Sequence, residues 1–157
     1  MQIEIRRAEE NDIEVSANMF NNYRVWYHQD ADLPAAQAFL TARLKNKESI
    51  IFLAFINGKP AGFTQLYPVF SSVRMRRAYL LNDLFVEEAA RKNGVAAKLL
   101  DAAIEFGKEN DAGFLMLQTS FDNKQAQALY AKAGWKKIED YIYEFDIVAS
   151  PQFGTRI

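Results

Sequence analysis

The chain opens with polar and apolar residues in alternation from Gln2 to Arg7, and this period of two predicts a strand. A helix is predicted next, because apolar residues then recur at steps of three and four. Asn11 followed by Glu14 matches a capping box at the start of this helix. The members of its apolar stripe are Ile13, Ala17, Phe20, Tyr23 and Tyr27.

A second helix is predicted from Asp32 to about Lys47. Asp32 is a suitable N-cap, and Pro34 falls in the first turn, where its missing N–H costs nothing. The residues of this helix that are expected to face inward are Phe39, Leu40 and Leu44.

A β-hairpin follows the two helices. Ser49–Ile56 is a continuous apolar strand, Asn57-Gly58 is a strong signal for a two-residue turn, and Ala61–Tyr67 is the return strand. Residues Pro68–Arg77 are expected to connect this hairpin to the next strand.

The centre of the chain combines a strand, a turn and a helix. Tyr79–Val86 is an apolar run of strand length, and a helical pattern begins at Gly94. The apolar face of this helix is formed by Val95, Leu99, Ala103 and Phe106. A strand that leads through a glycine turn into a helix directs unpaired N–H groups and the helix dipole to one place, which favours an anion such as phosphate.

The rest of the chain predicts a strand, a helix and two further strands. The strand is Phe114–Thr119, and the helix runs from about Gln125 to Ala133, ended by Gly134. The last two strands are predicted at Trp135–Ile138 and Tyr141–Val148, and Ser150–Ile157 has no periodicity. The order β-α-α-β-β-β-α-β-α-β-β predicts one α/β domain over residues 1–157, with a mixed sheet and helices on both faces. The central strand and Phe114–Thr119 are joined through a helix and should be parallel.

Composition excludes several kinds of function. The net charge is -1, and the local cluster of Arg74, Arg76 and Arg77 is interpreted as a solvated loop, so no nucleic-acid partner is expected. The chain has no cysteine, which excludes thiolate catalysis, and its single histidine, His28, is interpreted as a surface residue. No metal site is expected. No apolar span of membrane length is present, so the prediction is a cytoplasmic protein without a membrane partner.

Two sequence motifs resemble those of the GCN5-related N-acetyltransferase (GNAT) superfamily. Arg91-Lys92-Asn93-Gly94-Val95-Ala96 fits the family turn Gln/Arg-x-x-Gly-x-Gly/Ala. Asn123-x-x-Ala126-x-x-Leu129-Tyr130-x-x-x-Gly134-Trp135 fits Asn-x-x-Ala-x-x-Leu-Tyr-x-x-x-Gly-Phe, with tryptophan replacing phenylalanine. Both motifs lie in the expected elements, and the resemblance covers nearly the whole chain. Two departures concern the turn, where Lys92 replaces a glycine that many relatives have and Ala96 replaces the commoner third glycine.

The resemblance implies the GNAT fold and acetyl-coenzyme A as the acyl donor. In the family the central strand parts from its neighbour, and a freed strand N–H binds the thioester oxygen. The implied cofactor-binding residues are Leu84, Phe85, Val86, Arg91, Lys92, Asn93, Gly94, Val95, Ala96, Ala97, Asn123 and Ala126. Tyr130 matches the general acid of the family, since a phenol can protonate a departing thiolate only mildly uphill. The alternative for Tyr130 is an aromatic residue that packs in its helix.

The acceptor side is less well defined. Tyr23 and Tyr27 are interpreted as a wall of the substrate pocket, because aromatic rings suit organic cations, or alternatively as core residues. Tyr79–Val86 resembles the matching stretch of diamine acetyltransferases, with Asn82-Asp83 where those enzymes have Glu-Asp. Strand alternation predicts that Asn82 and Asp83 lie on opposite faces. Two interpretations of Asp83 stay open. It is either a pocket residue that attracts the amine or a structural residue that forms an ion pair, for example with an arginine.

The sequence predicts an N-acetyltransferase that transfers acetyl from acetyl-coenzyme A to a primary amine, with a small molecule favoured as acceptor. Two alternatives stay open. One is a protein or peptide N-acetyltransferase, which would present an open groove. The other is a non-catalytic acetyl-coenzyme A-binding module, against which Tyr130 argues, because a pure binder has no need for a general acid. A homodimer is also left open.

Overall fold

The computed structural model describes residues 1–149, which fall into one compact unit over residues 1–117 and a second from residue 118 onward. The first unit holds a five-stranded sheet in the order β1-β2-β3-β4-β5. Its strands are β1 (Ile3–Arg7), β2 (Ile50–Ile56), β3 (Lys59–Ser71), β4 (Arg76–Val86) and β5 (Phe114–Met116). Neighbours are antiparallel except β4 and β5, which are parallel. The predicted mixed sheet and its parallel pair are confirmed.

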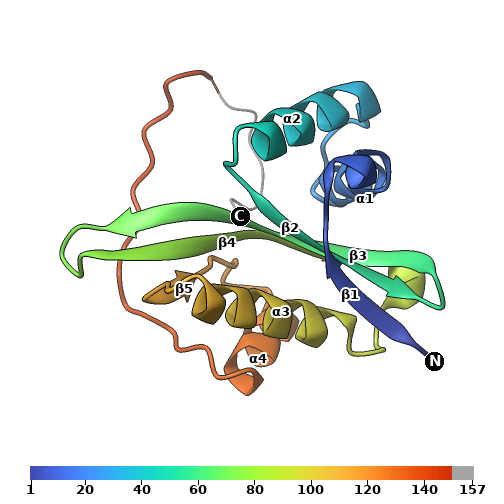
Figure 1. Cartoon of the computed structure of the whole chain (residues 1–157). Helices are drawn as coiled ribbons and strands as arrows, with labels where there is room; N and C mark the ends of the chain where they lie inside the picture. Colours follow the sequence, from blue (N-terminus) through green and yellow to red (C-terminus); the bar gives the residue numbers. More distant parts are fainter. Residues whose placement is uncertain (150–157) are drawn as a thin grey trace. The chain divides into compact units, whose positions relative to one another are not determined.

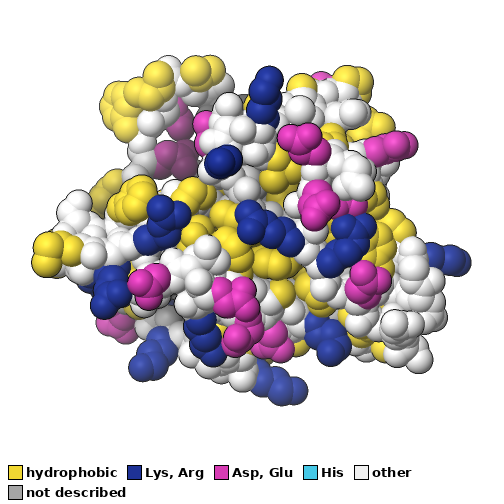
Figure 2. Space-filling model, viewed as in Figure 1, with side chains coloured by type: hydrophobic (Ala, Val, Ile, Leu, Met, Phe, Trp, Pro, Cys, Tyr) yellow, Lys and Arg dark blue, Asp and Glu magenta, His cyan; other side chains and the backbone are white. Residues whose placement is uncertain are grey.

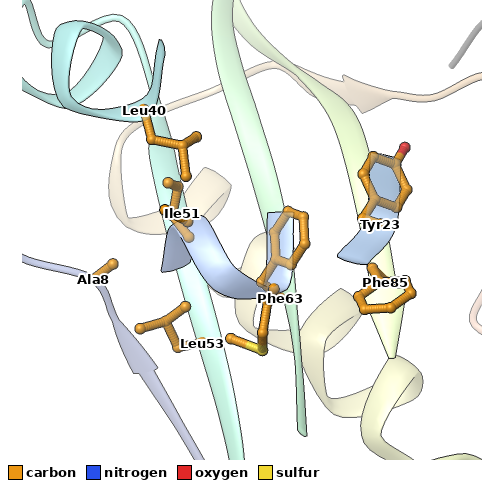
Figure 3. Packing of buried hydrophobic residues seen from close by; sticks show 9 residues of the cluster. Ala8, Tyr23, Leu40, Ile51, Leu53, Phe63 and Phe85 are labelled. Atoms are coloured by element: carbon orange, nitrogen blue, oxygen red, sulfur yellow. The ribbon is translucent and has the colours of Figure 1, made fainter. Parts of the chain in front are cut away.

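Helices cover both faces of this sheet, as predicted (Figure 1). Helices α1 (Ile13–Trp26) and α2 (Leu33–Lys45) lie on one face, and α3 (Val95–Glu109) lies on the other. The core under α1 and α2 includes Tyr23, Phe63 and Phe85 (Figure 3). The core under α3 includes Val95 and Leu99. The two faces of the sheet therefore pack against different helices.

The entry into α1 differs from the prediction. A short 3-10 helix, Glu10–Asp12, precedes α1, and the Asp12 carboxylate accepts a hydrogen bond of 2.8 Å from the Glu9 N–H. The capping pair is therefore Glu9 with Asp12, and the predicted pair of Asn11 and Glu14 is wrong. The reason lies in β1, since Arg6 donates two hydrogen bonds of 2.8 Å to Asp12 and fixes the carboxylate at this position.

We expect Asp12→Asn to lower the free energy of unfolding by about 1–2 kcal/mol at neutral pH, because a charged hydrogen-bonded pair is lost from a partly exposed site. Arg6 lowers the pKa of Asp12 below its usual range, so this contribution is present above the ordinary carboxylate pKa. It disappears as the pH falls through the lowered folded-state value. Urea unfolding of both proteins at neutral and at acidic pH should show the difference shrinking on acidification, whereas a constant difference would contradict the assignment.

The hairpin formed by β3 and β4 is longer than predicted. Residues 68–71 continue β3, and Arg76 and Arg77 begin β4, although residues Pro68–Arg77 were predicted to be a connection. Proline and the charged residues obscured the strand pattern, because these positions are exposed or only partly buried and carry no alternation of apolar and polar residues. The hairpin β2–β3 follows the prediction, with Asn57 and Gly58 at φ 49° and 79°.

The second unit contains α4 (Lys124–Lys132), close to the predicted helix. The strands predicted at Trp135–Ile138 and Tyr141–Val148 are wrong for the structure described, because neither segment is in a strand there. A strand exists only when a partner accepts its hydrogen bonds, and apolar alternation alone does not supply that partner. The side chains of this stretch stay exposed, with Tyr141 at 89% and Tyr143 at 91%. Ser150–Ile157, predicted to lack periodicity, lies outside the described residues.

The surface is of mixed charge. Figure 2 shows basic and acidic side chains interspersed over the face in view. Arg74, Arg76 and Arg77 are exposed, and Arg74 stacks over the Phe114 ring at 4.1 Å. Within residues 1–149, none of the helices has the length and apolar character needed to cross a membrane.

Candidate active site

The turn before α3 presents unsatisfied backbone donors. Gly94 is the N-cap of α3 with φ 81°, and it provides no capping side chain. The first hydrogen bond inside the helix is donated by the Lys98 N–H to the Gly94 carbonyl at 3.2 Å. The preceding N–H groups, including those of Val95, Ala96 and Ala97, therefore have no partner within the helix. They form, with the helix dipole, a site suited to phosphate oxygens.

The conformation of this turn explains its sequence. Lys92 has φ 64° and Gly94 has φ 81°, so both are left-handed, a conformation that glycine adopts most easily. A Cβ added at Gly94 would meet no atom within 4 Å, which leaves open space where the backbone can approach a ligand. Asn93 closes the turn by donating to the carbonyls of Ala90 and Arg91 at 3.1 and 3.2 Å. The residues present fit the pyrophosphate of coenzyme A.

Arg91 is held in place by two elements. Its Nε donates to the Val86 carbonyl at 3.1 Å, and its guanidinium lies 4.2 Å from the centre of the Trp26 ring at the end of α1. Together with Lys92, it places positive charge beside the free N–H groups. This arrangement favours an anion at the turn.

Strand β4 has a free edge next to this turn. The pairing with β5 is limited to Ala78–Leu80, although β4 continues to Val86. Within the sheet of residues 1–117, the backbone groups on that edge of Leu84, Phe85 and Val86 consequently have no strand partner. Leu84 and Val86 pack with the core under α3, whereas Phe85 packs with the core under α1. The edge without a strand partner is compatible with the parting that the family resemblance implied, which stays a prediction.

A β-bulge brings Asp83 to the face of α1. Gln65 pairs with Asp83 and Leu66 with Leu81, so Asn82 is an extra residue in β4. Before the bulge, Tyr79 contacts Phe106 of α3, and after it Phe85 contacts Tyr23 of α1. The bulge therefore reverses the faces of the strand.

Asn82 and Asp83 are brought together by the same bulge. The Asn82 amide donates to the Asp83 carboxylate at 3.2 Å. The prediction that these two side chains lie on opposite faces is wrong, because alternation does not continue through an extra residue.

The Asp83 carboxylate is buried among neutral donors. It is 6% exposed and accepts a hydrogen bond of 2.8 Å from the Gln65 amide. Within residues 1–149, no ion pair includes Asp83, so the alternative of an arginine partner is wrong for the part of the chain described. Burial raises the pKa of Asp83, and the donors Gln65, Asn82 and Tyr23 counteract part of that shift. The site holds a carboxylate whose charge has no cation from the described chain.

Two tyrosines of α1 lie beside this carboxylate. The rings of Tyr23 and Tyr27 meet edge to face at 4.9 Å, and burial raises the pKa of both phenols. Both phenols are therefore neutral near pH 7. Figure 3 shows the Tyr23 hydroxyl directed away from the apolar cluster around Phe63. Tyr23 is thus both a core residue and a residue of the site, which combines the two predicted alternatives, while Tyr27 is half-buried.

The remaining predicted site residues lie in the second unit and are described separately. Asn123 is the N-cap of α4, and its side chain accepts from the Ala126 N–H at 3.1 Å. Tyr130 is half-buried in the same helix, with its ring centre 6.3 Å from that of Trp135. The Asn-x-x-Ala pattern therefore has a capping role, and the roles of Asn123, Ala126 and Tyr130 toward a ligand stay predictions.

The sequence interpretation missed two residues of the site. Gln65 is 0% exposed in β3 and Ser49 is 5% exposed directly before β2, and both connect to Asp83 through hydrogen bonds. A signal existed, since Gln65 is an uncharged polar residue inside an apolar strand, where a buried amide requires partners.

A strand edge without a partner, beside an uncapped helix N-terminus, is the arrangement that the family resemblance implies for binding a coenzyme A thioester. The model of the acetyltransferase (GNAT) family matches residues 14–135, and the chain belongs to this family. It is an acetyl-coenzyme A-dependent acetyltransferase.

The chain is also similar to individual acetyltransferases in sequence and in structure. The chain is 47% identical over 139 residues to the uncharacterized N-acetyltransferase YhfO of Bacillus subtilis, covering 88% of this chain and 93% of that protein. A crystal structure of a probable acetyltransferase has a TM-score of 0.88 and 35% identity, covering 94% of this chain and 99% of the other. A soil-metagenome aminoglycoside acetyltransferase in complex with sisomicin has a TM-score of 0.81 at 18% identity, covering 94% and 97%. This last similarity shows the fold alone.

Proposed function

We propose that this acetyltransferase acts on a primary amine of a small molecule and that Asp83 holds the cationic form of that amine. The observation that carries the proposal is the buried carboxylate without a cation in the described chain. A buried charge is costly unless it is paired, and an ammonium group is the partner that an N-acetyltransferase brings to its site. In this proposal the rings of Tyr23 and Tyr27 cover the carbon chain of the amine. A small-molecule acceptor also agrees with the aminoglycoside acetyltransferase of the same fold.

The acyl donor supplies an activated acetyl thioester, and the chain's own residues then have three tasks. The first is to hold the ammonium group, which Asp83 does by charge. The second is to remove a proton so that the nitrogen can attack, and a carboxylate with a raised pKa is a better proton acceptor than an ordinary one. The third is to return a proton to the departing sulfur, the task proposed for Tyr130. The nitrogen–carbon bond forms as the carbon–sulfur bond breaks.

The substitution Asp83→Asn tests the acceptor role. We expect the KM for a cationic amine to rise about 10- to 100-fold, because the charge attraction in a water-poor site is lost. The Kd of acetyl-coenzyme A should not change. Because no ion pair is broken, the melting temperature should move by only a few degrees. Steady-state kinetics, calorimetry and a thermal scan measure the three quantities.

The exposed Asp101 of α3 offers a matched control, since Asp101→Asn removes the same charge away from the site. A large loss of melting temperature in Asp83→Asn, without a specific change in amine kinetics, would refute the pocket role. Amine kinetics unaffected by Asp83→Asn, together with efficient acetylation of peptides, would favour a protein acceptor instead.

A further inference from the structure

A line of three buried polar side chains crosses the sheet and ends at the proposed amine site. The Ser49 hydroxyl donates to Oε1 of Gln65 at 2.7 Å, and Nε2 of Gln65 donates to Oδ2 of Asp83 at 2.8 Å. The exposed fractions of the three residues are 5%, 0% and 6%. Ser49 lies directly before β2, whereas Gln65 and Asp83 lie within the neighbouring strands β3 and β4. Buried polar groups of this kind require exact partners, since an unsatisfied one is costly.

The Asp83 carboxylate, which only accepts when ionised, determines which way the Gln65 amide faces, and the Ser49 hydroxyl satisfies the Gln65 oxygen on the other side. An amide has an oxygen acceptor on one side and an NH₂ donor on the other, so it can bind Asp83 in only one of its two orientations. In the wrong orientation, the Gln65 oxygen would face the carboxylate and repel it. A donor at Oε1 stabilises the orientation in which Nε2 meets Asp83.

The donors around Asp83 leave room for one more. A carboxylate has about four acceptor positions on its two oxygens. Gln65 donates to Oδ2, and Asn82 donates to Oδ1 at the longer distance of 3.2 Å. The Tyr23 hydroxyl is also near enough to lower the pKa of this carboxyl. At least one acceptor position is left for an ammonium N–H.

We propose that Gln65, supported by Ser49, is a positioning residue that fixes the Asp83 carboxylate with one acceptor position directed at the acceptor amine. This inference rests on the proposed function, because it assigns a task to Asp83. It does not require Gln65 or Ser49 to contact the substrate. Both residues act through Asp83.

The other titratable or charged groups facing Asp83 are held constant in the test. Tyr23 and Tyr27 face it from α1, and Tyr67 faces it from β3. The charge of Arg43 in α2 lowers the pKa of Tyr67, and Arg43 is itself paired with Glu48 at 2.6 Å. Because substitutions at Ser49 and Gln65 leave these groups in place, a changed titration of Asp83 reports the hydrogen-bond line.

Two variants remove the line at different points. Gln65→Met keeps the size of the side chain but removes the donor to Asp83, which disfavours the charged carboxylate. We expect the pKa of Asp83 to rise by about one unit or more in this variant. Ser49→Ala leaves the donor but removes the hydrogen bond to Oε1 that supports it, so a smaller rise is expected. Thr64→Val is the matched control, because the Thr64 hydroxyl donates to the backbone carbonyl of Asp83 and not to its carboxylate.

The experiment follows Asp83 in two ways in the full chain. Carbon-detected NMR measures the titration of its carboxyl carbon in the free protein, and the acid limb of kcat/KM for a cationic amine measures it in catalysis. Both should move to higher pH in the order Ser49→Ala, then Gln65→Met, with Thr64→Val at the wild-type position. If Gln65→Met does not fold, Ser49→Ala alone still has to show the shift.

The possible failures are distinguishable. An unchanged titration of Asp83 in both variants overturns the positioning role, even where Asp83→Asn impairs amine binding. If the titration of the Asp83 carboxyl shifts but Asp83→Asn leaves the amine kinetics unchanged, the proposed function is overturned. The hydrogen-bonded line then has no role in catalysis.

Discussion

Replacement of Gly94 by valine should raise the Kd of acetyl-coenzyme A by about 10²–10³-fold, equivalent to roughly 3–4 kcal/mol of lost binding. Gly94 has φ 81°, where a β-branched residue is strained, so the turn would change its conformation. Any valine side chain that kept the turn would project into the open space beside the free N–H groups of α3. Both effects remove donors from the phosphates. Calorimetry with acetyl-coenzyme A measures the change.

Gly58 provides a matched control for backbone strain. It has φ 79° in the turn between β2 and β3, and a Cβ there also meets no atom within 4 Å. Gly58→Val should therefore carry a comparable conformational cost without weakening cofactor binding. Tight binding retained by a folded Gly94→Val protein, or an equal loss in Gly58→Val, would show that this turn does not hold the phosphates.

Tyr130→Phe should lower kcat by roughly 10²–10⁴-fold while the Kd of acetyl-coenzyme A stays nearly unchanged, because only a hydroxyl is removed. The basis is the family motif that places Tyr130 as general acid, together with its half-buried position in α4. Single-turnover measurements at saturating substrate separate this chemical effect from product release.

The matched control is Tyr143→Phe, which removes a hydroxyl from a tyrosine that is 91% exposed in the same unit. This variant should turn over at the wild-type rate. Full single-turnover activity in Tyr130→Phe would make Tyr130 an aromatic packing residue of α4 and leave the proton donor unassigned.

The fold could be predicted from the sequence where the apolar residues followed one clear spacing, either that of a helix or that of a strand. The helix after Gly94 and the hairpin at Asn57-Gly58 were predicted correctly, because apolar spacing and turn residues agreed there. The hairpin between β3 and β4 was underestimated, because Pro68 and the arginines interrupt the alternation in exposed strand ends. The segment Tyr141–Val148 failed for the opposite reason. Its alternation is good, but pairing with another strand decides whether a strand forms.

The candidate site could be predicted only in part. The glycine turn can be recognised from a short stretch of sequence, since its residues are consecutive and its conformation needs glycine. The environment of Asp83 cannot be recognised in this way, because one extra residue, Asn82, reverses the faces of β4 and no local signal marks that bulge. Gln65 and Ser49 join the site through pairing between strands far apart in sequence. Such contacts follow from strand register, which the sequence pattern alone does not determine.

The most direct test of the whole account is the release of coenzyme A from acetyl-coenzyme A with pairs of small acceptors matched in size. Each pair consists of a primary amine, cationic in water, and the corresponding alcohol. The account predicts that amines alone support rapid release by the wild-type protein and that Asp83→Asn raises their KM about 10- to 100-fold. Equal release with amines and alcohols, or amine kinetics that are the same in Asp83→Asn and wild type, would contradict it.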